Sequence, residues 1–388
     1  MTTSDLYAPV RPRYGSASLA DVLPGALAVL GVPGAPDPLG LTGQLDGVRR
    51  LAVLLVDGLG WHQIPQAAPH APMLAELTTA GGRPITAGFP STTPTSLVSL
   101  GTGTPPGPHG VLGFRLALPG TDRVLTHTTW QDDPDPRWWQ PLPTQLEVAR
   151  AAGVAVTVVS RPEFAGSGLT AAAYRGGTYR GAADAQELAT GMIAALRQAD
   201  GPALVYGYYP DLDRHGHITG VDSASWRATA VEIDRLLIRL VAGLPADAAL
   251  LVTADHGQIN VPDDRRFDFD GDDRLRAGVR VVAGEPRVRY LHVTPGARDD
   301  VISTWRSVLG GAAWVTSRDE AVAAGWFGPV PQAHLQRVGD VVVVCHDSYA
   351  VVASRTDNPL EARLVAYHGS YTAAEMTIPL LVVRGRTG

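Results

Sequence analysis

The stretch LAVLLVDG, residues 51–58, is an unbroken apolar run that ends in an aspartate and a glycine. It is too short for a typical helix, and its composition is typical of a strand buried on both faces. The same form recurs in GVAVTVVS (153–160), ALVYGYY (203–209), ALLVTADHG (249–257) and IPLLVV (378–383). These runs predict several buried strands of one sheet.

Helical patterns separate the apolar runs. Examples are SLADVLPGALAVLG (18–31), AQELATGMIAALRQA (185–199) and SWRATAVEIDRLLIRLVAGL (225–244). Strands that alternate with helices predict an α/β fold with a central, mostly parallel sheet flanked by helices. In such folds the functional site lies at the carboxyl ends of the strands, so the polar residues that follow each apolar run are the candidates for chemistry.

The pattern of charged and apolar residues changes between residues 262 and 354. A charged loop, DDRRFDFDGDDR (263–274), precedes segments with the patterns of a strand (287–293), a helix (297–310) and a strand (340–352). We therefore expect a small α+β insertion, or cap subdomain, over residues 262–354. The catalytic domain would comprise residues 1–261 and 355–388.

Composition excludes some classes of function. The formal net charge of −6 argues against a nucleic-acid-binding module, because such modules neutralise phosphates with a basic surface. The N-terminal residues contain no apolar segment, and no stretch approaches the roughly 18 apolar residues that a membrane span requires. We expect a cytoplasmic protein with no membrane partner.

The stretch FPSTTPTSLVSLGTGTPPGPHG (89–110) carries an unusual number of hydroxyls. Pro94 suits the first position of a helix, which would make Thr93 the N-cap. The positive end of that helix would hold an anion such as phosphate beside the Thr93 hydroxyl. The alternative is that Thr93 only caps the helix.

The segment DLDRHGHITG (211–220) contains two overlapping pairs with metal-ligand spacing. Asp213 and His217 form one D-x-x-x-H pair, and Asp211 and His215 form the other. From the spacing alone, either pair could bind one metal ion.

Further candidate ligands end other apolar runs. Asp57 ends the first run, Asp255 and His256 are adjacent in TADHGQ, and His368 precedes the last strand. Singly, each could be a helix cap or a structural histidine. Together, three carboxylates and three imidazoles suit two Zn²⁺-like ions of the kind used for in-line phosphoryl displacement.

In this combination the chain resembles the alkaline phosphatase superfamily, and within it the nucleotide pyrophosphatase/phosphodiesterase family. The resemblance runs in order through VDGLGW, FPSTTPTSLVSLGTGTPPGPHG, DLDRHGHITG, TADHG and YHGS. It implies a sheet flanked by helices and a Ser or Thr nucleophile between two metal ions. By this resemblance the metal ligands are Asp57, Asp255 and His256 at one ion and Asp213, His217 and His368 at the other.

The resemblance also selects between the two D-x-x-x-H pairs. The family pattern places a glycine directly before the ligand histidine and another three residues after it. Gly216 and Gly220 satisfy this pattern only when His217 is the ligand.

The nucleophile implied by the resemblance is Thr93, nine residues before Thr102. The T-x-P spelling common among the phosphodiesterases would choose Thr92 instead. One departure concerns the family's Asn, which donates to a phosphoryl oxygen, because Phe114 occupies the matching position. Another donor, such as a backbone N–H or an arginine, would have to serve.

The resemblance implies a metal-dependent hydrolase of phosphodiester or pyrophosphate bonds that acts on a small-molecule phosphate ester. Its cofactors would be two divalent ions, Zn²⁺ first and Mn²⁺ second. The alternatives are a phosphomonoesterase or phosphonate hydrolase on the same scaffold, or an inactive metal-binding protein. The sequence gives neither the substrate nor the oligomeric state.

Overall fold

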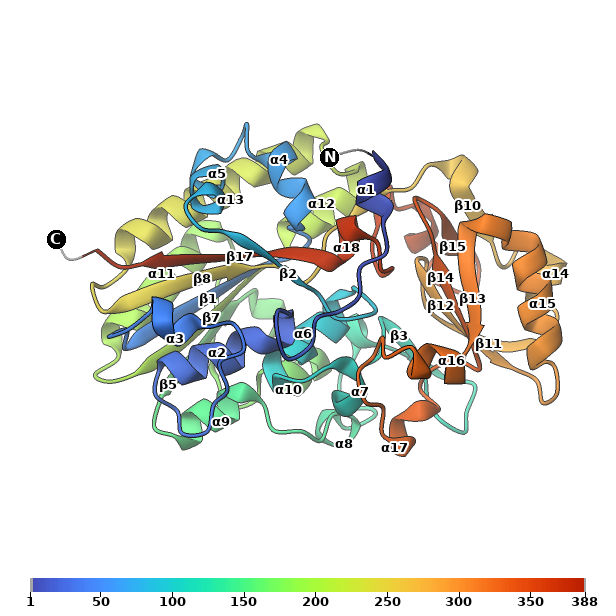
Figure 1. The fold of residues 1–388 in the computed structure, drawn as a ribbon, viewed down its shortest axis with the longest axis horizontal. Helices are drawn as coiled ribbons and strands as arrows, with labels where there is room; N and C mark the ends of the chain where they lie inside the picture. The colour runs from blue at the N-terminus through green and yellow to red at the C-terminus, as the bar shows by residue number, and fades with distance from the viewer. Residues whose placement is uncertain (1–2, 387–388) are drawn as a thin grey trace.

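The apolar runs form one central sheet of seven strands in the computed structural model, which describes residues 3–386 (Figure 1). The strands follow the order β2-β17-β8-β1-β7-β5-β6 across the sheet. Their bounds are β1 (Arg50–Val56), β2 (Arg83–Thr86), β5 (Ala155–Ser160), β6 (Thr178–Gly181), β7 (Ala203–Tyr209), β8 (Ala248–Thr253) and β17 (Thr377–Arg384).

The sheet is mostly parallel, as predicted. Strand β1 pairs in parallel with β7 and β8, and β5 pairs in parallel with β6 and β7. Strand β17 runs antiparallel to both its neighbours, β8 and β2. All seven residues of β7 and all six of β8 are buried, which explains their unbroken apolar sequences.

Helices cover both faces of this sheet, so the predicted α/β class is confirmed (Figure 1). The first face is covered by α5 (Pro72–Thr79), α11 (Ala185–Gln198) and α13 (Ala224–Gly243). The second face is covered by α2 (Val22–Val29), α6 (Thr93–Thr102), α9 (Gln145–Ala151) and α10 (Gly168–Tyr174).

Shorter elements connect these layers. The helices are α1 (Thr3–Tyr7), α3 (Leu41–Gln44), α4 (Ile64–Ala67), α7 (Pro106–His109), α8 (Pro136–Trp139), α12 (Asp211–Thr219) and α18 (Ala373–Met376). The short strand pairs are β3 (Arg115–Ala117) with β4 (Val124–Thr126), and β9 (Ile259–Asn260) with β16 (Ala366–Tyr367). The 3-10 turns are η1 (Leu19–Asp21), η2 (Trp61–Gln63), η3 (His127–Thr129), η4 (Pro162–Phe164), η5 (Asp263–Arg265), η6 (Gly310–Ala312) and η7 (Glu361–Arg363).

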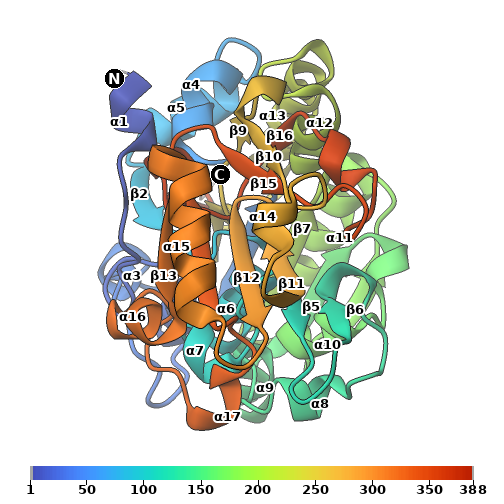
Figure 2. The ribbon, with the colours of Figure 1, turned by 90° about the vertical axis from the view of Figure 1, so that its right-hand side faces the viewer.

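The segment between β9 and β16 forms a second, smaller layer (Figure 2). It contains a four-stranded antiparallel sheet of order β11-β12-β14-β13 and a parallel pair, β10 with β15. The bounds are β10 (Arg266–Asp268), α14 (Asp273–Arg276), β11 (Val279–Glu285), β12 (Val288–Val293), α15 (Arg298–Leu309), β13 (Ala313–Ser317), α16 (Arg318–Ala323), α17 (Gln332–Leu335), β14 (Val341–Cys345) and β15 (Ala350–Val352). We refer to this segment, residues 262–354, as the insert.

The four-stranded sheet of the insert is buried on both faces. Along β14, Val341, Val343 and Cys345 belong to a core shared with α15, whereas Val342 and Val344 belong to the main core of the molecule. This alternation follows from the two-residue period of a strand. The insert is therefore packed onto the body of the protein along one face of its sheet.

Within residues 3–386, no helix combines the length and apolarity needed to cross a bilayer.

Candidate functional site

Three neighbouring strands of the central sheet, β7, β1 and β8, end at the same edge. Asp57 directly follows β1, Asp255 lies just beyond β8, and α12 starts just beyond β7. The turn after β1 depends on Gly58, which has a φ of +73°. A Cβ atom on Gly58 would lie 3.0 Å from the Cα of Asp213, so the glycine allows the β1 turn to approach α12 closely.

The first group of candidate ligands lies at the ends of β1 and β8. The Nε2 atom of His256 lies 3.5 Å from Oδ1 of Asp57 and 3.3 Å from Oδ2 of Asp255. All three side chains are buried. The other oxygen of Asp255, Oδ1, accepts the backbone N–H groups of Gly58 and His256 at 3.1 and 3.0 Å, which fixes the carboxylate.

The second group joins α12 to the segment after β16. Nε2 of His217 lies 3.2 Å from Oδ2 of Asp213, one helical turn away, and 3.2 Å from Nε2 of His368. Asp213 also belongs to a cluster with Asp57 and His256, in which the ligand atoms lie within 4.8 Å of one another. The rings of His256 and His368 are stacked with centroids 3.6 Å apart. The six residues therefore form one continuous cluster.

Each of the three imidazoles points Nε2 into this cluster and Nδ1 at a backbone carbonyl. Nδ1 of His217 lies 2.7 Å from the oxygen of Ala366, and Nδ1 of His368 lies 2.9 Å from that of Ser91. Nδ1 of His256 lies 3.2 Å from the oxygen of Gly257. A carbonyl only accepts hydrogen bonds, so each Nδ1 is placed to donate, and each Nε2 is a ligand atom when its ring is neutral. Metal-ligating histidines show this arrangement.

The cluster contains buried, unpaired carboxylate oxygens and carboxylates that repel one another, both of which a bound cation would stabilise. Oδ1 of Asp57 and Oδ2 of Asp255 are buried without a hydrogen-bond partner. Burial raises the pKa of Asp57 well above its usual value, and the carboxylates of Asp255 and Asp213 raise it further. A positive ion between the carboxylates would relieve their repulsion, and the facing Nε2 atoms of the imidazoles could bind it. The residues present therefore fit divalent metal ions.

The alternative pair on α12 lies apart from the cluster. The carboxylate of Asp211 pairs with the guanidinium of Arg161. Nδ1 of His215 lies 2.6 Å from the hydroxyl of Thr229 on α13. Both residues thus have other partners, whereas Asp213 and His217 meet His368.

Two residues that sequence reasoning missed hold the carboxylates in place. The hydroxyl of Tyr208, near the end of β7, donates to Oδ2 of Asp57. The amide of Gln258 donates to both the side chain and the backbone carbonyl of Asp213. Gln258 follows the Asp255-His256 pair closely, but Tyr208 sits in an apolar run that resembles ordinary core.

Helix α6 begins beside this cluster, one residue earlier than predicted. Thr92, not Thr93, is the N-cap, since its backbone is extended and its carbonyl accepts the first helical bond, from Ser96, at 2.9 Å. Thr93 is the first helical residue and Pro94 the second. The prediction failed because proline is tolerated throughout the first turn, where no N–H is required, and so does not fix the N-cap.

The two adjacent threonines have different surroundings. The Oγ1 atom of Thr93 lies 3.1 Å from Nε2 of His256, and its side chain is partly exposed. Thr92 is fully buried, and its Oγ1 has no hydrogen-bond partner. The hydroxyl of Ser96 donates to the carbonyl of Asp255 at 2.9 Å and ties α6 to the end of β8. The helix start therefore presents Thr93 to the cluster.

Two cavities adjoin the cluster. The tyrosine cavity, of about 160 Å³, is lined by Thr93 and by residues that include Phe164, Tyr174, Tyr179, Tyr206 and Tyr208. The histidine cavity, of about 70 Å³, is lined by His217, His368, Phe114, Glu285, Pro286, Glu361, Leu364 and Tyr367. Phe114 therefore lies at the site itself and presents an aromatic ring to it.

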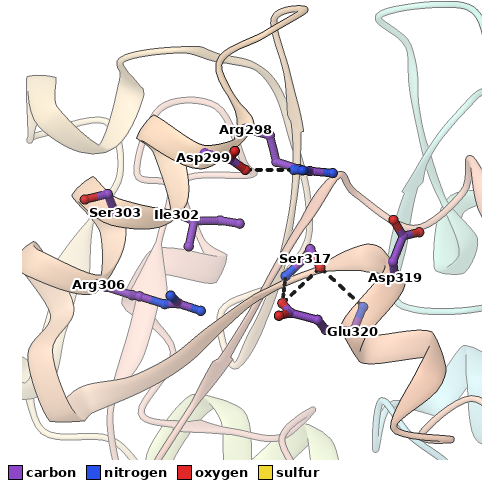
Figure 3. A pocket seen from close by; sticks show the side chains of 8 residues that line it. All are labelled: Arg298, Asp299, Ile302, Ser303, Arg306, Ser317, Asp319 and Glu320. Carbon is purple, nitrogen blue, oxygen red and sulfur yellow. Dashed lines mark hydrogen bonds and ion pairs between the residues drawn. The ribbon is translucent and has the colours of Figure 1, made fainter.

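A larger cavity lies elsewhere. It measures about 490 Å³ and is lined by α15, β13 and α16 of the insert, among them Arg298, Arg306 and Glu320 (Figure 3). Glu320 is held by Ser317 at the start of α16, and Arg298 pairs with Asp299. None of the six clustered acids and histidines lines this cavity, so its size does not connect it with the site.

The model of the type I phosphodiesterase/nucleotide pyrophosphatase family matches residues 51–371. That range contains all six clustered acids and histidines and both threonines. No curated protein sequence matches the chain significantly.

Solved structures share the fold at low sequence identity. Murine ectonucleotide pyrophosphatase/phosphodiesterase 5 aligns with a TM-score of 0.68 at 18% identity, over 87% of this chain and 88% of that one. The human protein of the same name aligns at 0.64 and 17%, over 86% and 87%. Phosphonoacetate hydrolase from Sinorhizobium meliloti 1021, in complex with phosphonoformate, aligns at 0.65 and 19%, over 87% and 91%.

Proposed function

The chain belongs to the type I phosphodiesterase/nucleotide pyrophosphatase family of the alkaline phosphatase superfamily, and from this premise we propose that it hydrolyses phosphodiester or pyrophosphate bonds through Thr93 and two metal ions. As a member of this family it is a metal-dependent phosphoric ester hydrolase. The proposal adds the nucleophile, the number of ions and the bond that is cleaved.

The observation that carries the proposal is the contact between Thr93 and the cluster. Oγ1 of Thr93 lies 3.1 Å from Nε2 of His256, whose ring stacks on that of His368. One hydroxyl at a helix N-terminus thus faces an array of three acids and three imidazoles. A partly exposed hydroxyl can meet a substrate, whereas the buried Thr92 cannot without a rearrangement of α6.

Following the family pattern, we assign the six residues of the cluster to two sites. Asp57, Asp255 and His256 would hold one ion, and Asp213, His217 and His368 would hold the other. Zn²⁺ accepts this mixture of oxygen and nitrogen ligands, and Mn²⁺ is the second choice. Bound ions would make the threonine hydroxyl and the attacking water more acidic and would offset the charge of the phosphoryl group.

The chain's own residues position the reacting groups. Oγ1 of Thr93 would attack phosphorus and form a phospho-threonine as the bond from phosphorus to the leaving oxygen breaks, and water would then release phosphate ester and restore the hydroxyl. The free N–H groups in the first turn of α6 would receive the phosphoryl oxygens. These N–H groups would replace the family's Asn as donors to the phosphoryl oxygens, since Phe114 occupies the position of that Asn. The neighbouring Arg115 is not free for this role, because it is already paired with Asp357 and Glu361.

One neighbour supports the choice of a threonine. A form of the murine phosphodiesterase described as inactive carries a threonine-to-alanine substitution and is in complex with AMP. A nucleotide-like ester is accordingly a reasonable substrate to test. The second candidate is phosphonate hydrolysis, which the likeness to phosphonoacetate hydrolase suggests.

A hydrolysis panel tests the proposal. Protein purified without chelator is assayed for metal content and then supplied with Zn²⁺, Mn²⁺ or Mg²⁺ and a chromogenic phosphodiester, phosphomonoester, phosphonate or sulfate ester. We expect two equivalents of metal and the highest kcat/KM with the phosphodiester. Preference for the monoester or the phosphonate would contradict the proposed bond, and a metal-loaded protein without any hydrolysis would indicate an inactive binding protein.

A further inference from the structure

The two cavities beside the cluster differ in position but share a charge pattern. Thr93 lines the tyrosine cavity, and His217 and His368 line the histidine cavity. Contacts from Thr93 to His256 and from His256 to His368 connect them. In-line displacement sends the leaving group of a diester away from Thr93. The histidine cavity would then receive the leaving group, and the tyrosine cavity would receive the substituent that stays on phosphorus.

Neither cavity offers a cation outside the metal cluster. The sequence contains no lysine, so all 32 of its Lys and Arg residues are arginines. Among residues 3–386, no arginine lines either cavity. The titratable side chains that do line them, apart from the two histidines and the tyrosines, are Glu163 in the tyrosine cavity and Glu285 and Glu361 in the histidine cavity. Burial raises the pKa of Glu285 to about 8 and the pKa of Glu361 above its usual value, so an anion beside them meets acids and no cation.

The nearest arginines are already neutralised. Behind the histidine cavity, Arg115 pairs with Asp357 at 2.6 Å and with Glu361 at 3.1 Å. Arg289 is fully buried and pairs with the same Asp357 at 2.7 Å. Beside the tyrosine cavity, Arg161 pairs with Asp211. These guanidinium groups would have to give up their carboxylate partners in order to bind an anion.

From this pattern we infer that the enzyme selects phosphodiesters whose two substituents carry no negative charge, with an aromatic or apolar group in the tyrosine cavity. The inference rests on the proposed function and narrows its substrate class. A carboxylate or second phosphate on either substituent would enter a cavity that offers no arginine and is lined by glutamates. Burying such an anion unpaired is strongly unfavourable.

Matched chromogenic substrates test the inference in the metal-loaded protein. For the tyrosine cavity, para-nitrophenyl phenyl phosphate is compared with para-nitrophenyl para-carboxyphenyl phosphate, which releases the same phenol. For the histidine cavity, it is compared with phenyl meta-carboxy-para-nitrophenyl phosphate, whose leaving group carries the carboxylate. We expect each carboxylated diester to have a kcat/KM lower by about ten-fold or more, the factor expected from one unpaired buried charge.

If the inference is correct, a positive charge placed in the tyrosine cavity should reduce the discrimination against the carboxylated diester. Glu163→Arg supplies the tyrosine cavity with a cation, and we expect it to raise kcat/KM for the para-carboxyphenyl diester relative to the phenyl diester. Glu163→Gln, the control for lost negative charge, should restore less. Thermal unfolding of both variants shows whether the fold is kept.

The outcomes separate the two claims. Equal kcat/KM for charged and uncharged diesters in the unmodified enzyme would overturn the charge selectivity and leave the proposed function in place. Turnover of phosphomonoesters or of phosphonoacetate, with no diester hydrolysed, would overturn the proposed function and the selectivity that rests on it.

Discussion

Thr93 and Thr92 are neighbours with the same hydroxyl, but only Thr93 reaches the cluster of acids and histidines. We predict that Thr93→Ala lowers kcat by about a thousandfold or more, because the nucleophile is lost. Both metal ions should stay bound, and Thr93→Ser should keep part of the activity. Steady-state kinetics and metal analysis measure these effects.

The control is Thr92→Ala, which should lower kcat far less. Peptide mapping after an acid quench with a slow substrate should find the phosphoryl group on Thr93. A phosphoryl group on Thr92 would move the nucleophile by one residue, and a fully active Thr93→Ala enzyme would remove Thr93 from the mechanism.

His217 and His215 lie two residues apart on α12 and have different partners. His217 meets Asp213 and His368, whereas His215 bonds Thr229. We predict that His217→Ala loses one equivalent of metal and most activity, because the ligand set at that ion is broken. His215→Ala should retain both ions. Elemental analysis of the two purified variants decides the matter, and equal metal content in both would reject His217 as a ligand.

Tyr208 connects the tyrosine cavity with the candidate metal ligands, because its side chain lines the cavity and its hydroxyl donates to Asp57. We predict that Tyr208→Phe weakens binding of the ion at Asp57 by about ten- to a hundredfold, as is typical when a partner of a ligand is removed. Competition with a chromophoric chelator measures this affinity. Tyr206→Phe is the matched control, since Tyr206 bonds Tyr174 instead, and equal affinities in the two variants would contradict the assigned role.

The sequence identified the candidate ligands more readily than their supporting residues. Asp57 and Asp255 were conspicuous because each ends an apolar run, and His217 stands at metal-ligand spacing from Asp213. Tyr208 and the carbonyl of Ser91 carry no such signal, since tyrosine also suits a buried strand and a carbonyl is present at every residue. Their roles depend on which distant segments meet, and that is a property of the folded chain.

At the scale of secondary-structure elements, the close packing of α6 on α10 positions the helix that carries Thr93. A Cβ atom on Gly101 of α6 would lie 2.0 Å from the carbonyl oxygen of Ala173 on α10. We predict that Gly101→Ala destabilises the protein by about 1–3 kcal/mol, because backbone atoms must separate. Urea unfolding followed by circular dichroism gives this free energy.

Gly43 in α3 provides the comparison. A Cβ atom there would meet nothing within 4 Å. Gly43→Ala should therefore be neutral or stabilise by about 0.5–1 kcal/mol, since alanine loses less conformational entropy in a helix. If Gly101→Ala were equally harmless, the packing of α6 on α10 would be looser than described.

The longest apolar runs in the sequence predicted the bounds of their strands most accurately. The run at residues 203–209 coincides with β7, because a strand buried on both faces excludes polar residues along its whole length. Short elements were harder to predict. The loop expected at residues 263–274 contains β10 and the start of α14, and the strand expected at 340–352 is divided into β14 and β15. Their formation depends on pairing with remote strands and is not encoded in local periodicity.

At the scale of the whole molecule, a buried ion pair joins the insert to the body. Arg287, between β11 and β12, contacts Glu375 of α18 through two bonds of 3.0 and 2.8 Å, and both residues are fully buried. We predict that Arg287→Met destabilises the protein by about 3–5 kcal/mol, because Glu375 is left as an unpaired buried charge. The urea midpoint measures the loss.

Two further variants test the cause of this loss. Arg287→Met combined with Glu375→Gln should recover part of the stability, since no buried charge remains. Arg298→Met removes an exposed pair with Asp299 and should lower the urea midpoint far less than Arg287→Met does. A double variant as unstable as the single one would indicate that packing, and not charge, accounts for the effect.

The antiparallel strand β17 has a consequence for synthesis of the chain. It lies between β2 and β8, yet it follows the entire insert in the sequence, so a nascent chain emerging from the ribosome holds two unpaired strand edges until β17 is translated. His368 emerges only shortly before β17. A product that stops within the insert would therefore lack a candidate metal ligand and expose the edge of β8, which makes it a target for chaperones and for aggregation.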